Sequence, residues 1–243
     1  MKVLFMGDSI THLNVWVKYF NEIIKPEHHI NIAVSGSRWC DFVDTVYDGE
    51  PVWRQEDGGG PNNTICNQVE KVLRAKDETH PLYKRDDAYD DFDVIFVSAG
   101  TNDAIPEKLP TADEINTQFI NNDQTTLPLE KVDRKTFAGS MRYTYEHLRR
   151  LYPNAKIFYC SPVQAAENIR TFASIKLKGQ LIKAICDRIS DVVFVDTFNC
   201  GICGIYEEWN KNGRDLIDGL HPNDNGGKKI AEYNARAVKL QFI

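Results

Sequence analysis

The sequence predicts an α/β fold in which a parallel sheet of five strands carries helices on both faces. Five short apolar runs rich in Val, Ile and Phe are separated by longer stretches in which apolar residues recur at steps of three and four. This alternation is typical of parallel sheets, because parallel neighbours need a crossover between them. A chain of 243 residues can bury a sizeable core, and we expect one domain over residues 1–243.

The predicted elements follow one another along the chain. Strands are expected at residues 3–6, 30–34, 94–98, 157–160 and 192–195. Three sets of apolar residues at helical spacing predict helices: Leu13, Trp16, Phe20, Ile23 and Ile24; Phe137, Met141, Leu148 and Leu151; and Leu177, Leu181, Ile185 and Ile189. The aromatic members are assigned to the core. The last helix is expected to begin near Asn223 and Asp224, which can cap it.

Two segments, residues 47–91 and 104–133, do not fit the alternation. The first contains a Gly-Gly-Gly-Pro run at 58–61 and then a stretch from Cys66 to Ala75 with helical spacing, and the second contains three prolines. Connections of this length often carry function. We therefore expect both to be loop insertions that form rims over a site at the ends of the strands.

Composition limits the partners and the compartment. The formal net charge of −6 argues against a nucleic-acid surface. No run approaches the roughly 18 apolar residues of a membrane helix, so no membrane partner is expected. The apolar run after Lys2 is too short for a signal peptide. The chain as given is expected to be cytoplasmic, or secreted or periplasmic if a signal peptide was removed.

The number and spacing of the cysteines do not predict a structural disulfide or a metal centre. The six cysteines are Cys40, Cys66, Cys160, Cys186, Cys200 and Cys203. A domain of this size does not need disulfides, and we expect the thiols to be mostly free. The last two form a lone C-x-x-C without a second pair of ligands, which does not predict zinc. No metal and no cofactor are expected.

Four short motifs lie at or beyond the ends of the predicted strands. They are Gly7-Asp8-Ser9-Ile10, Gly36 within Ala33-Val34-Ser35-Gly36-Ser37, Gly100-Thr101-Asn102-Asp103, and Asp218-x-x-His221. In this order they resemble the four blocks of the SGNH (GDSL-type) hydrolases, although Ala33 replaces a glycine that many members carry. The resemblance implies a flavodoxin-like three-layer α/β/α fold and ester hydrolysis.

The residue types in these motifs suit nucleophilic catalysis. Serine is a weak nucleophile until a base takes its proton, and His221 is the candidate base for Ser9. Asp218 can bond the other imidazole nitrogen and hold its tautomer. The order Ser, Asp, His resembles that of the α/β-hydrolases, but their G-x-S-x-G elbow is absent here.

The same motifs offer donors for an oxyanion hole. Ester hydrolysis passes through a tetrahedral oxyanion, which prearranged N–H groups stabilise. If the first strand lies between the second and third, the residues that follow these strands meet in one crevice. The donors are then the backbone N–H groups of Ser9 and Gly36 and the side-chain amide of Asn102.

Asp8, His12, Trp39 and Asp103 are candidates for substrate contact because they lie close to the motifs. His12 follows the serine by one helical turn, and Asp8 has a structural hydrogen bond within its turn as the alternative role. A metal-dependent phosphoester hydrolase that uses Asp8, Asp103 and Asp218 also stays open, although no ligand spacing supports a metal.

We expect a serine ester hydrolase that acts on small acyl esters, with carbohydrate O-acetyl esters preferred. Trp39, Trp53, Asn62 and Asn63 in the long loops suit sugar hydroxyls better than a long acyl chain. A lipase or thioesterase-type acyl hydrolase and a non-catalytic carbohydrate-binding module on the same fold stay open, because the motifs do not separate them. The expected partner is a small-molecule or carbohydrate ester, and no oligomeric state is predicted.

Overall fold

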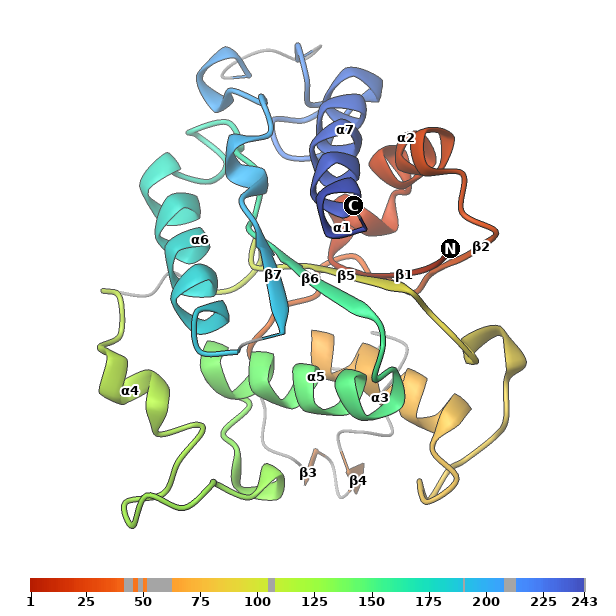
Figure 1. Cartoon of the computed structure of the whole chain (residues 1–243). Coiled ribbons are helices and arrows are strands. Elements are labelled where there is room, and N and C mark those ends of the chain that lie inside the picture. Colours follow the sequence, from red (N-terminus) through yellow and green to blue (C-terminus); the bar gives the residue numbers. More distant parts are fainter. Residues whose placement is uncertain are drawn as a thin grey trace.

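The structure is a computed structural model that describes residues 1–41, 46–47, 50–51, 63–104, 108–189, 191–207 and 213–242. Its centre is a five-stranded sheet (Figure 1), made of β1 (Lys2–Gly7), β2 (His28–Asn31), β5 (Val94–Ser98), β6 (Lys156–Cys160) and β7 (Val192–Val195). The strand order is β2-β1-β5-β6-β7, and every neighbouring pair is parallel. This is the flavodoxin-like order, so the predicted fold class is confirmed. A separate antiparallel pair joins β3 (Val46–Tyr47) to β4 (Glu50–Pro51).

The second strand begins and ends earlier than the predicted 30–34. The Asn31 side chain accepts a hydrogen bond from Ala33 N at 3.1 Å and donates to the Thr11 carbonyl at 2.9 Å, which turns the chain out of strand geometry. Ile32 and Val34 still donate to the carbonyls of β1, at 2.9 and 3.0 Å. The chain therefore stays beside β1 as it approaches the Gly36 motif.

One face of the sheet packs against α3 (Ile65–Lys76), α5 (Phe137–Leu151) and α6 (Phe172–Cys186). Figure 1 shows α3 and α5 crossing below the sheet, opposite α2 and α7. The helix predicted from Cys66 to Ala75 is confirmed by α3. The expectation that this segment forms a rim over the site is wrong. Ile65, Val69 and Val72 are fully buried in the core, so this part of the 47–91 segment covers the sheet rather than forming a rim.

The other face packs against α2 (Val15–Ile24) and α7 (Asp224–Gln241). Trp16 and Phe20 of α2 meet Phe5 and Phe96 of the sheet with ring centroids 5.3–5.7 Å apart, mostly edge to face. Such pairs add about 0.5–1.5 kcal/mol each beyond the burial of area. The core assignment of Trp16 and Phe20 is confirmed, whereas Leu13 and Ile23 of the same predicted face are exposed.

The predicted start of the last helix is confirmed. Asn223 is the N-cap of α7, and its side chain accepts hydrogen bonds from Asn225 N and Gly226 N. The remaining helices are short: α1 (Ser9–His12), α4 (Ala112–Asn116), and the single-turn η2 (Asp87–Tyr89), η3 (Leu129–Lys131), η4 (Thr197–Asn199) and η5 (Gly204–Tyr206). In the part of the chain that the structure describes, no helix is both long and apolar enough to cross a membrane.

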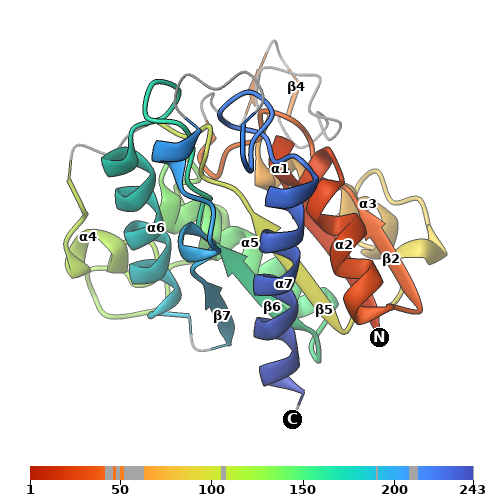
Figure 2. The same ribbon diagram turned by 90° about the horizontal axis from the view of Figure 1, so that it is seen from above.

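Seen from above, α1 and the loop that precedes α7 lie at one end of the sheet, and both chain termini lie at the opposite end (Figure 2). The α1 end is the carboxyl end of the parallel strands, because α1 begins directly after β1. Loops that follow parallel strands gather at this end. The fold therefore brings the sequence motifs to one edge of the sheet.

Candidate active site

Ser9 lies at a tight junction between β1 and α1. Gly7, the last residue of β1, allows this junction, since a Cβ there would lie only 2.4 Å from the Ser98 carbonyl oxygen of the neighbouring strand. Asp8 is the N-cap of α1, and its Oδ1 accepts a hydrogen bond from Ile10 N at 3.0 Å. The serine is thereby held at the first position of the helix, at the carboxyl end of β1.

The side chains of Ser9, His221 and Asp218 form a continuous hydrogen-bonded chain. Ser9 Oγ lies 2.9 Å from His221 Nε2, and His221 Nδ1 lies 2.7 Å from Asp218 Oδ2. With Nδ1–H donating to the carboxylate, Nε2 is left to accept from the serine hydroxyl. The structure thus places the three predicted catalytic residues together, although 212 positions separate the serine from the histidine.

The turn before α7 fixes the acidic member of this chain. Asp218 Oδ1 accepts from the backbone N–H groups of Leu220 at 3.0 Å and His221 at 2.8 Å. Partial burial would raise the pKa of Asp218, but these N–H groups and the imidazole outweigh it and lower the pKa. The turn is tied to the rest of the protein because Ala166 N donates to the Gly219 carbonyl at 2.7 Å. Asp218 is therefore an ionised and oriented partner for the imidazole.

The two further oxyanion candidates meet beside the serine motif. Gly36 has a φ of +83°, a left-handed conformation that favours glycine, in the loop after β2. Asn102 follows β5, and its Nδ2 donates to the Ser37 carbonyl at 3.1 Å. The loops that follow β1, β2 and β5 therefore converge, as the predicted strand order requires.

Gln68 of α3 is a site residue that the sequence analysis did not identify. Its Oε1 accepts from Gly7 N at 2.9 Å, and its Nε2 donates to the Gly7 carbonyl at 2.8 Å and to Ser37 Oγ at 2.9 Å. This buried amide joins the end of β1 to the loop after β2. A polar residue in phase with Ile65 and Val69 on the apolar face of a helix is the signal that points to such a role.

Asn63 supports the same loop from a second direction. Its Nδ2 donates to the Ser35 carbonyl at 2.7 Å, and its Oδ1 accepts from Ser37 Oγ at 2.7 Å. Gly36 lies between these two anchored residues. Asn63 therefore has a structural contact in place of the sugar contact that the sequence analysis assigned to it, and Trp53 and Asn62 lie outside the described residues.

Three of the four candidate substrate contacts are buried, which corrects the prediction. Asp8 is 1% exposed, Trp39 is 0% exposed and Asp103 is 5% exposed. The Trp39 indole donates to the Ala99 carbonyl at 3.2 Å, and the Asp103 carboxylate accepts from Trp39 N at 3.0 Å and Cys40 N at 2.9 Å. Trp39 and Asp103 hold loops in place because their polar atoms bond within the protein, whereas Asp8 is bonded through Oδ1 and its buried Oδ2 has no hydrogen-bond partner among the described residues.

Burial also changes the acidity of these carboxyl groups. Burial raises the pKa of Asp8 to about 6, although the N–H of Ile10 and the hydroxyl of Thr101 oppose it. Burial raises the pKa of Asp103 as well, against the N–H groups of Cys40 and Trp39 and the ammonium of Lys178. Both carboxyl groups are enclosed and directed at backbone donors. Within the described ranges no three His, Cys, Asp or Glu side chains gather as metal ligands.

His12 is exposed and lines a groove beside the serine helix. Its Nδ1 lies 2.7 Å from the Ala33 carbonyl, so the ring is oriented by the loop after β2. The groove has a volume of about 670 Å³, and Asn14, Asn31 and Lys71 are among its polar lining residues. His12 is therefore the candidate substrate contact that the structure leaves accessible.

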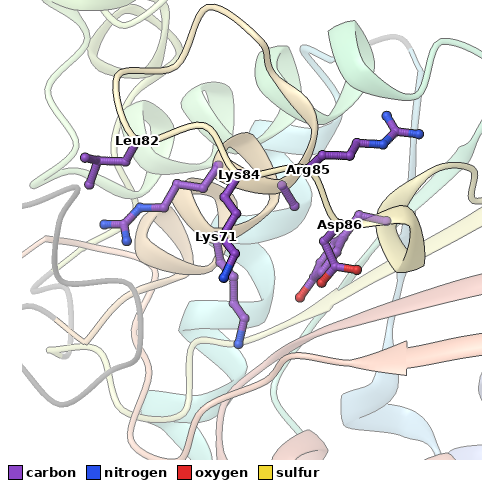
Figure 3. Close-up of a pocket in the computed structure, with 8 residues that line it drawn as sticks. Lys71, Leu82, Lys84, Arg85 and Asp86 are labelled. Atoms are coloured by element: carbon purple, nitrogen blue, oxygen red, sulfur yellow. The ribbon is translucent and has the colours of Figure 1, made fainter.

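A second pocket, of about 340 Å³, shares Lys71 with this groove and runs along α3 (Figure 3). Its wall is rich in charge, but Figure 3 shows Arg85 pointing away from Lys71 and Lys84. Arg85 instead forms ion pairs with Asp87 at 2.7 Å and Asp90 at 2.5 Å. None of the predicted site residues lines this pocket.

The profile of the GDSL-like lipase/acylhydrolase family matches residues 5–229. No curated protein sequence gives a significant match. The matched range contains every predicted site residue from Asp8 to His221.

Several solved structures share the fold at low identity. A possible lipase from Chitinophaga pinensis is 18% identical with a TM-score of 0.59, and the match covers 99% of this chain and 98% of that one. Est24, a carbohydrate acetylesterase from Sinorhizobium meliloti, is 17% identical with a TM-score of 0.53 and 99% coverage of both chains. A family two carbohydrate esterase from Clostridium thermocellum is 17% identical with a TM-score of 0.56, covering 99% of this chain and 64% of that one.

The motifs, the strand order and the family profile lead to one assignment. The profile spans nearly the whole chain, and the neighbours in structure include proteins described as lipases and carbohydrate esterases. Together they support an ester hydrolase. The chain belongs to the GDSL-like lipase/acylhydrolase family.

Proposed function

We propose that the protein is a serine-dependent hydrolase of small acyl esters, and that carbohydrate O-acetyl esters are its substrates. The observation that carries the proposal is the chain Ser9 Oγ to His221 Nε2 at 2.9 Å and His221 Nδ1 to Asp218 Oδ2 at 2.7 Å. A base aligned on the serine hydroxyl in this way is what activates the nucleophile.

The first half of the reaction transfers the acyl group to the enzyme. Ser9 Oγ attacks the ester carbonyl carbon while His221 Nε2 takes the hydroxyl proton. The carbonyl oxygen becomes an oxyanion. The imidazolium then gives its proton to the leaving alcohol, the carbon–oxygen bond to the alcohol breaks, and an acyl-serine remains. Asp218 stabilises the imidazolium because it is ionised and bonded to Nδ1–H.

Water completes the cycle by the same steps. His221 takes a proton from water, the resulting hydroxide attacks the acyl-serine, and Ser9 regains its proton as the carboxylic acid leaves. The oxyanion forms twice. Its proposed donors are the N–H groups of Ser9 and Gly36 and one hydrogen of the Asn102 amide, whose other hydrogen is bonded to the Ser37 carbonyl. Loss of one such donor typically costs about 2.7–4 kcal/mol of transition-state stabilisation.

The groove beside α1 supports a polar alcohol partner. His12 and Asn14 present an imidazole and an amide along it, and such groups can exchange hydrogen bonds with sugar hydroxyls. The Asn31 amide is bonded to Thr11, Asn14 and Ala33 instead. Carbohydrate esterases among the neighbours in structure agree with this substrate class. Trp39 no longer supports it, since the indole is buried in the core.

Esters of longer acyl groups are the second candidate substrates, because apolar side chains are exposed near Asp218. Ile217, next to Asp218, is 56% exposed, and Ile169 is exposed where it contacts the turn at Gly219. Apolar side chains at this position favour an apolar acyl group. The alternative is a lipase or thioesterase-type acyl hydrolase on the same catalytic residues.

The test compares hydrolysis of p-nitrophenyl acetate, butyrate and octanoate with release of acetate from an acetylated xylo-oligosaccharide. Wild type is measured beside Ser9→Ala, with and without chelator. Activity that resists chelator, vanishes in Ser9→Ala and is highest on the acetylated oligosaccharide is expected. A maximum on octanoate would favour the lipase-type alternative. Equal rates in wild type and Ser9→Ala would reject the serine mechanism, and a wild type that hydrolyses none of these esters would restore the binding-module hypothesis.

A further inference from the structure

A buried lysine lies behind the candidate site on α6. Lys178 is 1% exposed, and it falls on the helix face that also buries Ile175, Leu181 and Ile182. An ammonium group taken out of water costs several kcal/mol unless charges and hydrogen bonds compensate it. The position of this cation in the core therefore requires specific partners.

Those partners are the residues on either side of Asn102. Lys178 Nζ donates to the Thr101 carbonyl at 3.2 Å. Burial lowers the pKa of Lys178, and the carboxylates of Asp103 and Asp8 oppose that effect, while Arg170 and Arg38 add to it. The ammonium is thus bound to the carbonyl before the asparagine and attracted by the carboxylate after it.

Asp103 also binds the loop after β2. Its two carboxylate oxygens accept from Trp39 N and Cys40 N, at 3.0 and 2.9 Å, just beyond the Gly36 and Ser37 turn. Two backbone donors on one carboxyl group favour its ionised form, because each oxygen must accept. A nearby cation favours the same form.

We infer that Lys178 is a positioning residue for the oxyanion hole: it holds Asn102 through the Thr101 carbonyl and, through the ionised Asp103, holds the loop that carries Gly36. The inference rests on the proposed function, because it assumes that these two residues bind the oxyanion. It assigns a role to a side chain that never reaches the substrate.

Replacing Lys178 by an apolar residue has two separable consequences. The Thr101 carbonyl loses its donor, and Asp103 loses the attraction of the Lys178 ammonium. The carboxyl group of Asp103 then takes up a proton at higher pH, and in the protonated state one of its oxygens carries a hydrogen and faces a backbone N–H. The loop after β2 is released as the pH falls.

The test measures kcat, KM and the pH dependence of p-nitrophenyl acetate hydrolysis in Lys178→Met and Lys178→Gln. Gln retains an N–H donor for the Thr101 carbonyl without the charge. For Lys178→Met we expect kcat to fall by about 10- to 100-fold at pH 7 and KM to stay within about twofold of wild type. We also expect the acidic limb of the pH–rate profile to move to higher pH by about one unit, as the loss of a nearby charge would produce. Lys178→Gln should show the same movement of the acidic limb with a smaller loss of kcat.

Lys183→Met is the matched control, since Lys183 lies on the same helix with a side chain that is 56% exposed and paired with Asp187 at the surface. It should keep the wild-type kcat and pH profile. Asp103→Asn should also lower kcat, and adding Lys178→Met to it should cost only the share that depends on the Thr101 carbonyl, because the contribution through Asp103 is already lost.

Circular dichroism and thermal melting establish the folded fraction of each variant. If Lys178→Met does not fold, Lys178→Gln tests the inference, because it keeps a hydrogen-bonding group at the buried position. A folded Lys178→Gln or Lys178→Met with the wild-type acidic limb and kcat within twofold overturns the inference. Failure of the proposed function is a different result: Ser9→Ala would then retain the wild-type rate, whatever Lys178 does.

Discussion

Asp8→Asn is predicted to stabilise the protein at neutral pH. Asp8 is buried, and burial raises its pKa from 3.8 to about 6. A rise of roughly 2 in pKa, at about 1.36 kcal/mol for each pH unit, means that the ionised carboxylate costs about 3 kcal/mol of folding free energy above pH 6. Asn keeps the side-chain oxygen that accepts from Ile10 N and carries no charge.

The sign of the pH dependence follows from proton binding. Between pH 3.8 and about 6 the folded state holds the Asp8 proton more tightly than the unfolded state, so the stability of the wild type falls as pH rises through this window. The asparagine variant lacks that dependence. The gap between the two proteins should therefore be about 3 kcal/mol at pH 7.5 and should shrink toward zero as the pH approaches 4.

The assay is urea unfolding followed by circular dichroism at pH 4.5, 5.5, 6.5 and 7.5. Asp191→Asn is the control, because the Asp191 side chain is 63% exposed. It should change the free energy of unfolding by less than about 0.5 kcal/mol at every pH. An Asp8→Asn protein no more stable than wild type at pH 7.5 would refute the burial cost as the origin of the raised pKa.

Three further predictions concern catalysis and the loops that support it. Asp218→Ala removes the acceptor of His221 Nδ1–H and should lower kcat for p-nitrophenyl acetate by about 10²- to 10⁴-fold at pH 7; a loss below tenfold in steady-state assays would contradict the orienting role. Asn102→Ala should lower kcat by about 10²- to 10³-fold with KM nearly unchanged, and a purely KM effect would place the amide on the ground-state substrate instead. Gln68→Leu leaves Gly7 N–H and C=O without their side-chain partner and should reduce the free energy of unfolding by about 2–4 kcal/mol in urea titration; unchanged stability would show that backbone or water replaces the amide.

Local sequence patterns predicted the parts of the fold that depend on local chemistry. The apolar runs predicted β1, β5 and β6 because a strand buried on both faces must be apolar along its length, and they also located the edge strands β2 and β7. Asn223 was identified as a cap because a cap needs only a side chain next to the first N–H groups of its helix. The end of β2 was missed because the Asn31 side chain, bonded to Thr11 on α1, interrupts the strand.

The residues of the candidate site also differ in how far the sequence predicts their roles. Ser9, Asp218 and His221 were identified because their residue types and order suit a nucleophile, an orienting acid and a base, and the structure brings them into contact. Proximity in sequence to the motifs predicts Asp8 and Asp103 as candidate substrate contacts, with a turn hydrogen bond as the alternative for Asp8, because it does not show whether a side chain faces solvent. Both face the interior. The turn hydrogen bond of Asp8 is present.

The sequence by itself determined the alternation of strands and helices, the polar motifs at the ends of the strands, and the family. Only the tertiary structure decided which polar side chains support those motifs from behind. Gln68 and Lys178 come from helices far along the chain, and each acts by meeting backbone groups of a different segment. No local pattern encodes such contacts, since their free energy comes from satisfying buried donors, acceptors and charges that exist only once the helices pack on the sheet.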